Sequence, residues 1–538
     1  MAGARTHGRT ERARMIRASV GRCIGASLAC AAPLNAQFIQ PEDRTLITDF
    51  SYVTALAATQ TILYAATPTA LVVYDRQALR WQGAVGVADG YPDGGPVGMA
   101  ANPMDDSVWL AASGRWLLYR PFGRTFEGGP LPGRAIQVVL DRDDPVSGAW
   151  YQTSLGWYFV DRGGIPRGGN PPPPARRLAM LSRAELRRAV PALDLALSRI
   201  TRDERLRPFE ITAAAASQLG EAVYVGTNGN GTFRVDPVGA QAERLPAGLI
   251  APGVGALALA GGRLCAGTDH GLASRASSWT AGRRGVTCLR DDLGDITGYE
   301  APPGAIVGAT VTAVALTRRG VWAGSDEGLT RLGSRPVRLT TVQGLPANQV
   351  RALAADDGGV WVGTTAGIAL VSDDDRPVVR SAVSFGAAVG ALLLSRDTLW
   401  IGSALGLVAL PRGAAEPVVI DGGPALRLPV VDLAATHDTI VVATPGRILW
   451  RAGGTWTDAG AGSPAVGRVA AVAAAEGSVW AAGSAGIAQL SPRSGVWTSF
   501  AAPRDVPAPV RDVVVSERWV WLATEAGLVR LDRRAITR

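Results

Sequence analysis

The chain has 538 residues, of which 47% are hydrophobic and 19% are charged, so it is long enough for two or more domains and too apolar for a disordered protein. Its 66 Gly and 35 Pro suit many short strands separated by turns, and no stretch approaches eighteen consecutive apolar residues, which excludes a transmembrane helix. The net charge of +8 is concentrated in residues 1–36 (+5) and 162–210 (+6); because the remainder carries −3, we expect no nucleic-acid partner.

The N-terminal segment, residues 1–36, has the pattern of an export signal. Arg17 and Arg22 form a basic region, and Cys23 to Leu34 is a short apolar stretch of small residues. A cleavage pattern then ends at Ala36. We therefore expect a periplasmic or secreted protein.

The cysteines and the start codon leave alternatives open. Translation is compatible with a start at Met1 or at Met15. The sequence before Cys30 resembles a lipoprotein box but lacks the usual aliphatic residue three positions earlier, so a lipid anchor is not favoured. Beyond the export signal, Cys265 and Cys288 either form a disulfide or are two buried small residues.

One pattern recurs along the chain and is typical of a four-stranded β unit. In its clearest copy, Val350-Arg-Ala-Leu-Ala-Ala precedes a polar turn, Val360-Trp-Val-Gly-Thr, a tight turn and Ile368-Ala-Leu-Val. Eight of the ten intervals between eleven such copies span 38 to 45 residues, the length of one propeller blade. The anchor residues are Tyr64, Trp109, Trp150, Tyr224, Cys265, Trp322, Trp361, Trp400, Val442, Trp480 and Trp521. The sequence therefore predicts an all-β propeller of about eleven blades, arranged as two rings.

Each copy also predicts where its strands lie. In the clearest copy we expect strands at 350–355, 360–364, 368–371 and 378–384, rich in the β-branched and aromatic residues that suit a pleated sheet. A glycine recurs where the hairpin between the second and third strands requires a positive φ. These glycines are Gly271, Gly328, Gly367, Gly406, Gly486 and Gly527.

The two ends of the repeat array complement each other. The last copy stops after its third strand at Leu528 to Leu531, and residues 44–51 form an extended segment without an inner strand of their own. If residues 44–51 supply the outer strand of the last blade, the ring closes and no sheet edge stays open.

The division of the blades between the rings stays open at this stage. The irregular stretch from Ala281 to Gly308 favours a first propeller of about five blades at 38–280 and a second of about six at 281–538. Closure by residues 44–51 instead implies that one ring is inserted within the other.

The repeats resemble the two-component-regulator propeller repeat family. The resemblance rests on Val360-Trp-Val-Gly-Thr with its following glycine and on Gly344-Leu-Pro-Ala-Asn-Gln-Val, and it covers most of residues 45–535. It implies an extracytoplasmic domain that senses ligands, often sugars. We expect neither a membrane span nor a kinase after Arg538, so a separate membrane protein would carry any signal.

Residues 162–207 interrupt the repeats. Pro171 to Pro174 form a stiff spacer, Ser182 to Glu185 fit a capping box, and leucines at near-helical spacing continue to Leu197, with Pro191 expected to kink or divide the helix. The segment is either a basic arm that docks on a partner or an anionic surface, or an insertion with solvated arginines. The arm residues are Arg176, Arg177, Arg183, Arg187 and Arg188, with Arg199 and Arg202 on the same helical segment.

Groups for catalysis or metal binding are scarce. His270 and His437 fit turns, and no cluster of His or Cys predicts a metal site. Asp291 to Asp295 and Asp373 to Asp375 are either calcium ligands or, as we favour, solvated loop acids. No nucleophile elbow, phosphate loop or dinucleotide motif is present, so we predict no catalytic residue, metal or cofactor.

A ligand is expected on the face formed by the loops between blades and by the hairpins between second and third strands. The candidate binding residues are Tyr91, Asp93, Asp269, Asp326, Glu327, Asn348 and Glu525, each of which also suits turn geometry alone. We predict an exported, non-enzymatic propeller that binds a glycan or a protein partner. The alternative is a hydrolase or lyase acting on polysaccharide, which would need two carboxylates about 5–10 Å apart at a ring axis.

Overall fold

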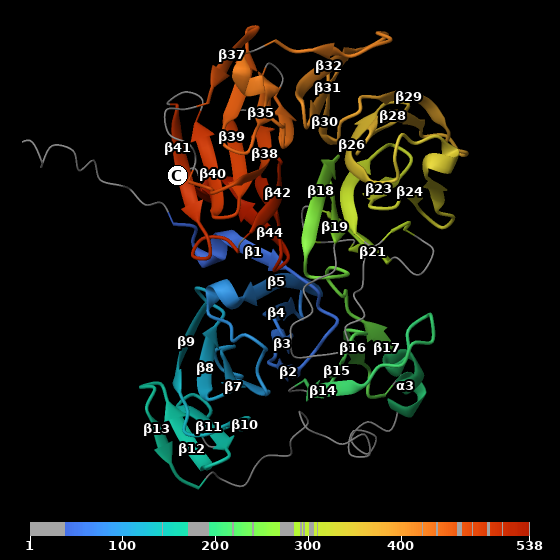
Figure 1. Ribbon diagram of the computed structural model, residues 1–538. Helices are drawn as coiled ribbons and strands as arrows, with labels where there is room; N and C mark the ends of the chain where they lie inside the picture. The colour runs from blue at the N-terminus through green and yellow to red at the C-terminus, as the bar shows by residue number, and fades with distance from the viewer. Residues whose placement is uncertain are drawn as a thin grey trace, which may run out of the picture. The chain divides into compact units, whose positions relative to one another are not determined.

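In the residues that it describes, the computed structural model shows eleven four-stranded antiparallel blades and a few short helices (Figure 1), which confirms the predicted all-β propeller. It describes residues 38–536 except for 142–143, 171–192, 218–219, 239–240, 269–284, 291–292, 294–295, 301–305, 309, 422, 437–438, 460–464, 476, 492–494 and 508. Several residues singled out above fall outside the described ranges: the export signal, Asp269, His270, Asp291, Asp295, His437, Arg176, Arg177, Arg183, Arg187 and Arg188.

The clearest repeat folds as expected. Its strands are β26 (Val350–Asp356), β27 (Gly359–Thr364), β28 (Gly367–Ser372) and β29 (Val379–Ser384), each within two residues of its predicted bounds. Gly367 has a φ of +157°, and a Cβ on it would collide with the carbonyl oxygen of Val383. The hairpin between the second and third strands therefore requires glycine at this position.

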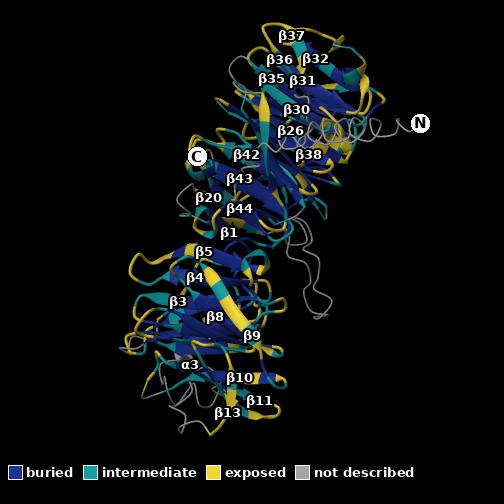
Figure 2. Cartoon of the chain, turned by 90° about the vertical axis from the view of Figure 1, so that its left-hand side faces the viewer, coloured by how far each residue is buried: buried dark blue, intermediate teal, exposed yellow. Residues whose placement is uncertain are grey.

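In most blades the outer strand is less buried than the strands in the middle of the blade. Trp109, Trp322, Trp480 and Trp521, which are anchors of the repeat, are among the largest fully buried side chains. Figure 2 shows the same gradient, because β8 (Arg115–Arg120) is largely buried and β9 (Thr125–Pro130) is largely exposed. The blades thus cover one another's inner faces, as a radial stack requires.

Four blades make up what we call the four-bladed part. Their inner strands contact one another in the order β14, β2, β6, β10, and in the described residues no comparable packing joins β10 to β14. Besides β8 and β9, the strands of these blades are β2 (Ala55–Ala58), β3 (Ile62–Ala66), β4 (Ala70–Asp75), β5 (Arg80–Gly86), β6 (Gly98–Ala101), β7 (Val108–Ala112), β10 (Ala135–Leu140), β11 (Gly148–Thr153), β12 (Gly156–Asp161), β13 (Pro166–Gly168), β14 (Ile211–Ala216), β15 (Val223–Thr227), β16 (Thr232–Val235) and β17 (Ala242–Arg244).

Seven blades form what we call the seven-bladed ring. Their inner strands contact one another in the order β18, β22, β26, β30, β34, β38, β42, and β42 contacts β18, which closes the ring. Its further strands are β18 (Val254–Ala260), β19 (Arg263–Thr268), β20 (Gly285–Arg290), β21 (Thr297–Glu300), β22 (Val311–Leu316), β23 (Val321–Ser325), β24 (Leu329–Leu332), β25 (Val337–Leu339), β30 (Val389–Ser395), β31 (Thr398–Ser403), β32 (Gly406–Pro411), β33 (Val418–Val419), β34 (Asp432–Ala435), β35 (Thr439–Ala443), β36 (Ile448–Ala452), β37 (Thr455–Asp458), β38 (Val469–Ala475), β39 (Ser478–Gly483), β40 (Gly486–Ser491), β41 (Val496–Ala501), β42 (Val510–Val515), β43 (Trp519–Thr524) and β44 (Leu528–Asp532).

The N-terminal strand β1 (Arg44–Ile47) is the fourth strand of the blade that contains β42, β43 and β44. It pairs antiparallel with β44 from Arg44 opposite Leu531 to Ile47 opposite Leu528. On its other side Leu46 faces Ala84 of β5, so one eight-stranded sheet joins this blade to the first blade of the four-bladed part. The four-bladed part is consequently inserted between the first strand of the ring and the rest of it.

The boundary at 280/281 drawn from the sequence falls inside a blade. Strands β18 to β21, residues 254–300, form one sheet, and Cys265 of β19 is disulfide-bonded to Cys288, directly opposite on β20. The irregular sequence after Ala281 thus includes the third and fourth strands of this blade. The pairing of the two cysteines, left open by the sequence, is also answered.

Helix α3 (Leu193–Thr201) covers the blade at one end of the four-bladed part. Ala196, Leu197 and Ile200 pack on the outer face of β14 to β17, against Val225 and Phe233 among others. The described helix begins two residues after Pro191, where a break was expected. The other helices in the described part of the chain are single turns: η1 (Pro41–Asp43), η2 (Val87–Asp89), η3 (Thr341–Gln343), η4 (Pro424–Arg427) and α4 (Arg533–Ile536). No helix of the described residues is long and apolar enough to cross a membrane.

Candidate functional site

The residues predicted for the loop face are distributed over several blades. Tyr91 is buried, and its hydroxyl donates a hydrogen bond of 2.5 Å to the carbonyl oxygen of Thr67. Burial raises the pKa of this phenol well above its usual value. Tyr91 therefore holds a turn of the first blade, whereas its neighbour Asp93 is exposed.

Three further candidates lie on one blade or on the loop that follows it. Asp326 Oδ1 accepts a hydrogen bond of 3.3 Å from the Thr310 amide, and Glu327 beside it is exposed. Asn348 Oδ1 accepts a hydrogen bond of 2.8 Å from the Thr341 amide, at the start of η3. The side chains of Asp326 and Asn348 thus stabilise turns, which the sequence had left as an alternative to ligand binding.

The acidic run Asp373 to Asp375 binds arginines and a tryptophan. Asp373 accepts from the Trp322 indole at 3.1 Å, Asp374 pairs with Arg380 at 3.0 Å, and Asp375 pairs with Arg319 at 3.2 Å. The hydrogen bond from Arg380 holds the pKa of Asp374 below its usual value. Within the residues that the structure describes, no three His, Cys, Asp or Glu side chains gather as a metal site would require.

Among the candidate binding residues that the structure describes, Glu525 lines a pocket, which we call the junction pocket. This pocket has a volume of about 380 Å³ and lies where the loop faces of the four-bladed part and the seven-bladed ring meet. Glu525 forms an ion pair of 2.8 Å with Arg511, and both side chains are about one-third exposed. The four-bladed part contributes Thr69 and the turn Gly86 to Asp89; the ring contributes Pro503, Pro507, Ala526 and Val529; the segment Pro252–Gly253 completes the wall.

Strand β1 forms one wall of the junction pocket. Arg44 and Leu46 both line it, and the Arg44 guanidinium is ion-paired with the carboxylate of Asp89. Both of these charged side chains are buried, and the second oxygen of Asp89 accepts a hydrogen bond of 3.1 Å from the Gly86 amide. The ion pair thus links strand β1 to the turn Gly86 to Asp89, two segments that line the pocket.

Two carboxyl groups missed by the sequence analysis lie on inner strands of the ring; we call Asp432 and Asp512 the inner carboxyls. Asp432 on β34 accepts hydrogen bonds of 2.8 Å from the amides of Leu433 and Val472. Asp512 on β42 accepts 2.7 Å hydrogen bonds from Leu257 and Val513. Val472 and Leu257 belong to the next blade in each case, so each carboxyl group ties two neighbouring inner strands together.

Both inner carboxyls have raised pKa values. Burial raises the pKa of Asp432 to about 6. Burial, and then the negative charge of Asp432, raises the pKa of Asp512 to about 8. In other blades the same position of the repeat holds alanine, as at Ala313 and Ala352, so an acid at an alanine position was the signal that could have revealed them.

Comparisons with known proteins leave the family undetermined. No family model matches the chain, and no curated protein matches it. Among solved structures, the chain is similar to the extracellular domain of a hybrid two-component system from B. thetaiotaomicron, with 11% identity over 89% of this chain and 70% of that one and a TM-score of 0.41. The resemblance of the repeats to the two-component-regulator propeller family leads one to expect such a neighbour.

Two other solved structures show how varied the similar proteins are. Virginiamycin B lyase from Staphylococcus aureus shares 16% identity over 52% of this chain and 95% of its own length, with a TM-score of 0.42. PorZ, a surface component of the type-IX secretion system of Porphyromonas gingivalis, shares 12% identity over 91% and 87%, with a TM-score of 0.38. The chain is a β-propeller protein. Its own eleven four-stranded blades show this fold.

Proposed function

We propose that this β-propeller protein is exported and non-enzymatic, and that it binds a ligand or protein partner in the junction pocket. The proposal rests on the meeting of three chain segments in this pocket: the turn Gly86 to Asp89, strand β1 and the hairpin that contains Glu525. A pocket of this size suits a small ligand or one or two side chains of a partner. The pattern of residues 1–36 supports export.

The walls of the junction pocket come from both the four-bladed part and the seven-bladed ring, which favours a sensor or scaffold role. A ligand in the junction pocket contacts the four-bladed part and the seven-bladed ring at once, so its binding energy favours the arrangement that brings both walls together. The polar groups at hand are the Arg511–Glu525 ion pair and the hydroxyl of Thr69. Both a glycan and a protein side chain offer partners for these groups, and the two classes are tested separately below.

A polysaccharide-acting enzyme, the alternative, would need two carboxylates near a ring axis, and the inner carboxyls lie on inner strands of the ring. Each of them already accepts two backbone hydrogen bonds and joins adjacent inner strands. A general acid or base must reach its substrate with a free oxygen or proton. The geometry of Asp432 and Asp512 therefore favours a structural role.

Filling the junction pocket with a large side chain is expected to abolish binding. Ala526 lies at the tip of the hairpin that lines the pocket, so Ala526→Trp blocks it. The matched control is Ala366→Trp, at the same hairpin position of the blade β26 to β29 and equally half-buried. Thermal shifts would be measured with separate panels of neutral oligosaccharides and of peptides. A ligand at a hundredfold excess over its Kd should stabilise the wild type by about 2.7 kcal/mol.

We expect one panel to contain a ligand whose shift survives Ala366→Trp and disappears in Ala526→Trp. A shift from the oligosaccharide panel would assign a glycan, and a shift from the peptide panel would assign a protein partner. Equal shifts for wild type and Ala526→Trp, or no shift in either panel, would contradict the junction pocket as the binding site.

A further inference from the structure

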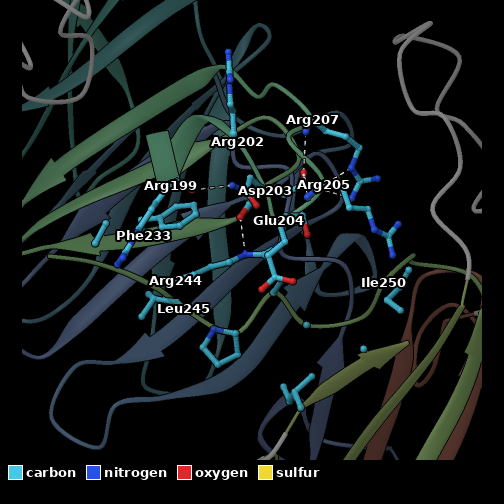
Figure 3. A pocket seen from close by; sticks show the side chains of 18 of the residues that line it. Arg199, Arg202, Asp203, Glu204, Arg205, Arg207, Phe233, Arg244, Leu245 and Ile250 are labelled. Atoms are coloured by element: carbon cyan, nitrogen blue, oxygen red, sulfur yellow. Dashed lines mark hydrogen bonds and ion pairs between the residues drawn. The ribbon is translucent and has the colours of Figure 1, made fainter. Parts of the chain in front are cut away.

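A second and larger pocket, which we call the arginine pocket, lies at the base of the inserted segment (Figure 3). It has a volume of about 930 Å³ and is formed by the end of α3, the loop from Arg202 to Arg207, strand β17 and residues 245–250. Phe233 and Leu245, both buried, form an apolar part of its wall. The volume is within the range of pockets that enclose most of a small ligand.

Charge distinguishes this pocket from the rest of the propeller body. Its lining holds five arginines and two acids: Arg199, Arg202, Arg205, Arg207, Arg244, Asp203 and Glu204. Figure 3 shows Arg199 beside Phe233 on one side of the pocket and Arg205 and Arg207 on the other. Since the chain outside residues 1–36 and 162–210 has a net charge of −3, this concentration of positive charge is local.

One of the two acids is already neutralised. Asp203 accepts hydrogen bonds from the amides of Arg205 at 3.0 Å and Arg207 at 2.9 Å, and from Arg207 Nε at 2.6 Å. Although burial opposes it, the hydrogen bond from Arg207 holds the pKa of Asp203 below its usual value. Asp203 therefore fixes the loop and does not compete for the other guanidinium groups.

Two arginines of the pocket keep their guanidinium groups available. Arg199 and Arg202 are exposed, and neither forms an ion pair within the part of the chain that the structure describes. Their backbone is nonetheless rigidly placed. The amide group of Asn230, which is 2% exposed, donates a hydrogen bond of 3.0 Å to the carbonyl oxygen of Ile200, and Ile200 itself is fully buried.

Arg244 is positioned by the same asparagine. Its Nε donates a hydrogen bond of 2.8 Å to the backbone carbonyl oxygen of Asn230, so the guanidinium is oriented from its stem side. An arginine held in this way loses less side-chain entropy when it binds, and its planar fork matches the two oxygens of a carboxylate or phosphate. The pocket thus combines one pre-oriented arginine with two available ones.

We propose that the arginine pocket binds an oligoanion, a ligand that carries two or more carboxylate or phosphate groups on a compact carbon or oxygen frame. Two separated anionic groups are needed because the side chains of the two available arginines, Arg199 and Arg202, extend in different directions (Figure 3). The apolar surface of Phe233 and Leu245 accommodates the frame of the ligand. This site is separate from the junction pocket and independent of the function proposed there.

The test is calorimetric titration of the full chain with three probes: tripolyphosphate, trigalacturonate and inorganic phosphate. We expect at least one of the two oligoanions to bind, and inorganic phosphate to bind at least about tenfold more weakly because it engages one group of arginines only. Whichever oligoanion binds more tightly identifies phosphate or carboxylate as the source of the charge.

A double variant and a matched control make the site specific. Arg199→Gln/Arg202→Gln should weaken oligoanion binding by about tenfold or more, because it removes two charge-assisted contacts. Arg335→Gln/Arg338→Gln removes two exposed arginines at the same spacing from the seven-bladed ring and should leave the affinity within about twofold. Unchanged Tm values for both variants would show that folding is intact. The proposal is overturned if neither oligoanion binds, or if the two double variants weaken binding equally.

Discussion

Replacing Leu46 with proline is expected to destabilise the protein by about 5 kcal/mol or more, because β1 is an interior strand of an eight-stranded sheet. Leu46 is 5% exposed and lies between Val529 of β44 and Ala84 of β5. Proline would remove a backbone donor and the buried isobutyl group together. Chemical denaturation followed by tryptophan fluorescence measures the change.

The matched control for this substitution is Val419→Pro. Val419 belongs to β33, the short outer strand of another blade of the same ring, and it is 74% exposed. An exposed outer strand tolerates proline, so a loss of no more than about 1 kcal/mol is expected. Comparable losses for the two variants would mean that β1 is a peripheral strand and that the ring does not depend on it.

The free energy of unfolding of Asp512→Asn, relative to that of the wild type, is expected to increase as the pH rises from about 4 to about 8. The folded-state pKa of Asp512 is raised to about 8 from an ordinary value of 3.8, so between these values the folded state binds more protons than the unfolded state. The stability that this carboxyl group contributes is therefore present below pH 4 and is lost as the pH rises through 8.

Across this pH range the free energy of unfolding of the variant relative to the wild type should change by about 3 kcal/mol. This is less than the full pKa shift of Asp512 implies, because the side chain is partly exposed to water. Denaturation curves of Asp512→Asn and the wild type at pH 5, 7 and about 9 measure it. Asp375→Asn, at a carboxyl group that is 99% exposed, is the control and should follow the wild type at every pH. A pH-independent difference between Asp512→Asn and the wild type would show that folding does not raise the pKa of Asp512.

The blade repeat could be predicted from the sequence because equivalent strands of the blades carry similar apolar and aromatic residues, which are buried in the same way. Trp322, Trp361 and Trp400 stand 39 residues apart, and the strands around them lie where the pattern places them. The segment at 44–51 could likewise be expected to pair with the last copy, since both lack a neighbour in sequence; the structure has this strand as Arg44–Ile47.

The division between rings could not be read in the same way. The seam was placed at Ala281 because the local sequence is irregular, yet packing between inner strands, such as β42 against β18, decides which blades share a ring. Sequence spacing carries no information about contacts between residues 250 positions apart. Glu525, Arg199 and Arg202 were named from the sequence, but the pockets that they line were not predicted, since each pocket is assembled from segments that are distant in the chain.

Turn residues were the weakest basis for predicting a site. Tyr91 and Asn348 occupy loops where ligands bind in propellers, but their polar atoms are used by nearby backbone groups. Glu525 differs because its partner Arg511 comes from another strand and both border a cavity.

Hydrogen exchange of the backbone amides of β1, followed by mass spectrometry on the intact protein, tests whether this strand completes the last blade of the seven-bladed ring and frames the junction pocket. Residues 44–47 are expected to exchange as slowly as the interior strand β43 and far more slowly than the exposed strand β33. Exchange of residues 44–47 at the rate of β33 would contradict this expectation, because β1 would then lie outside the sheet and the junction pocket would lack one of its walls.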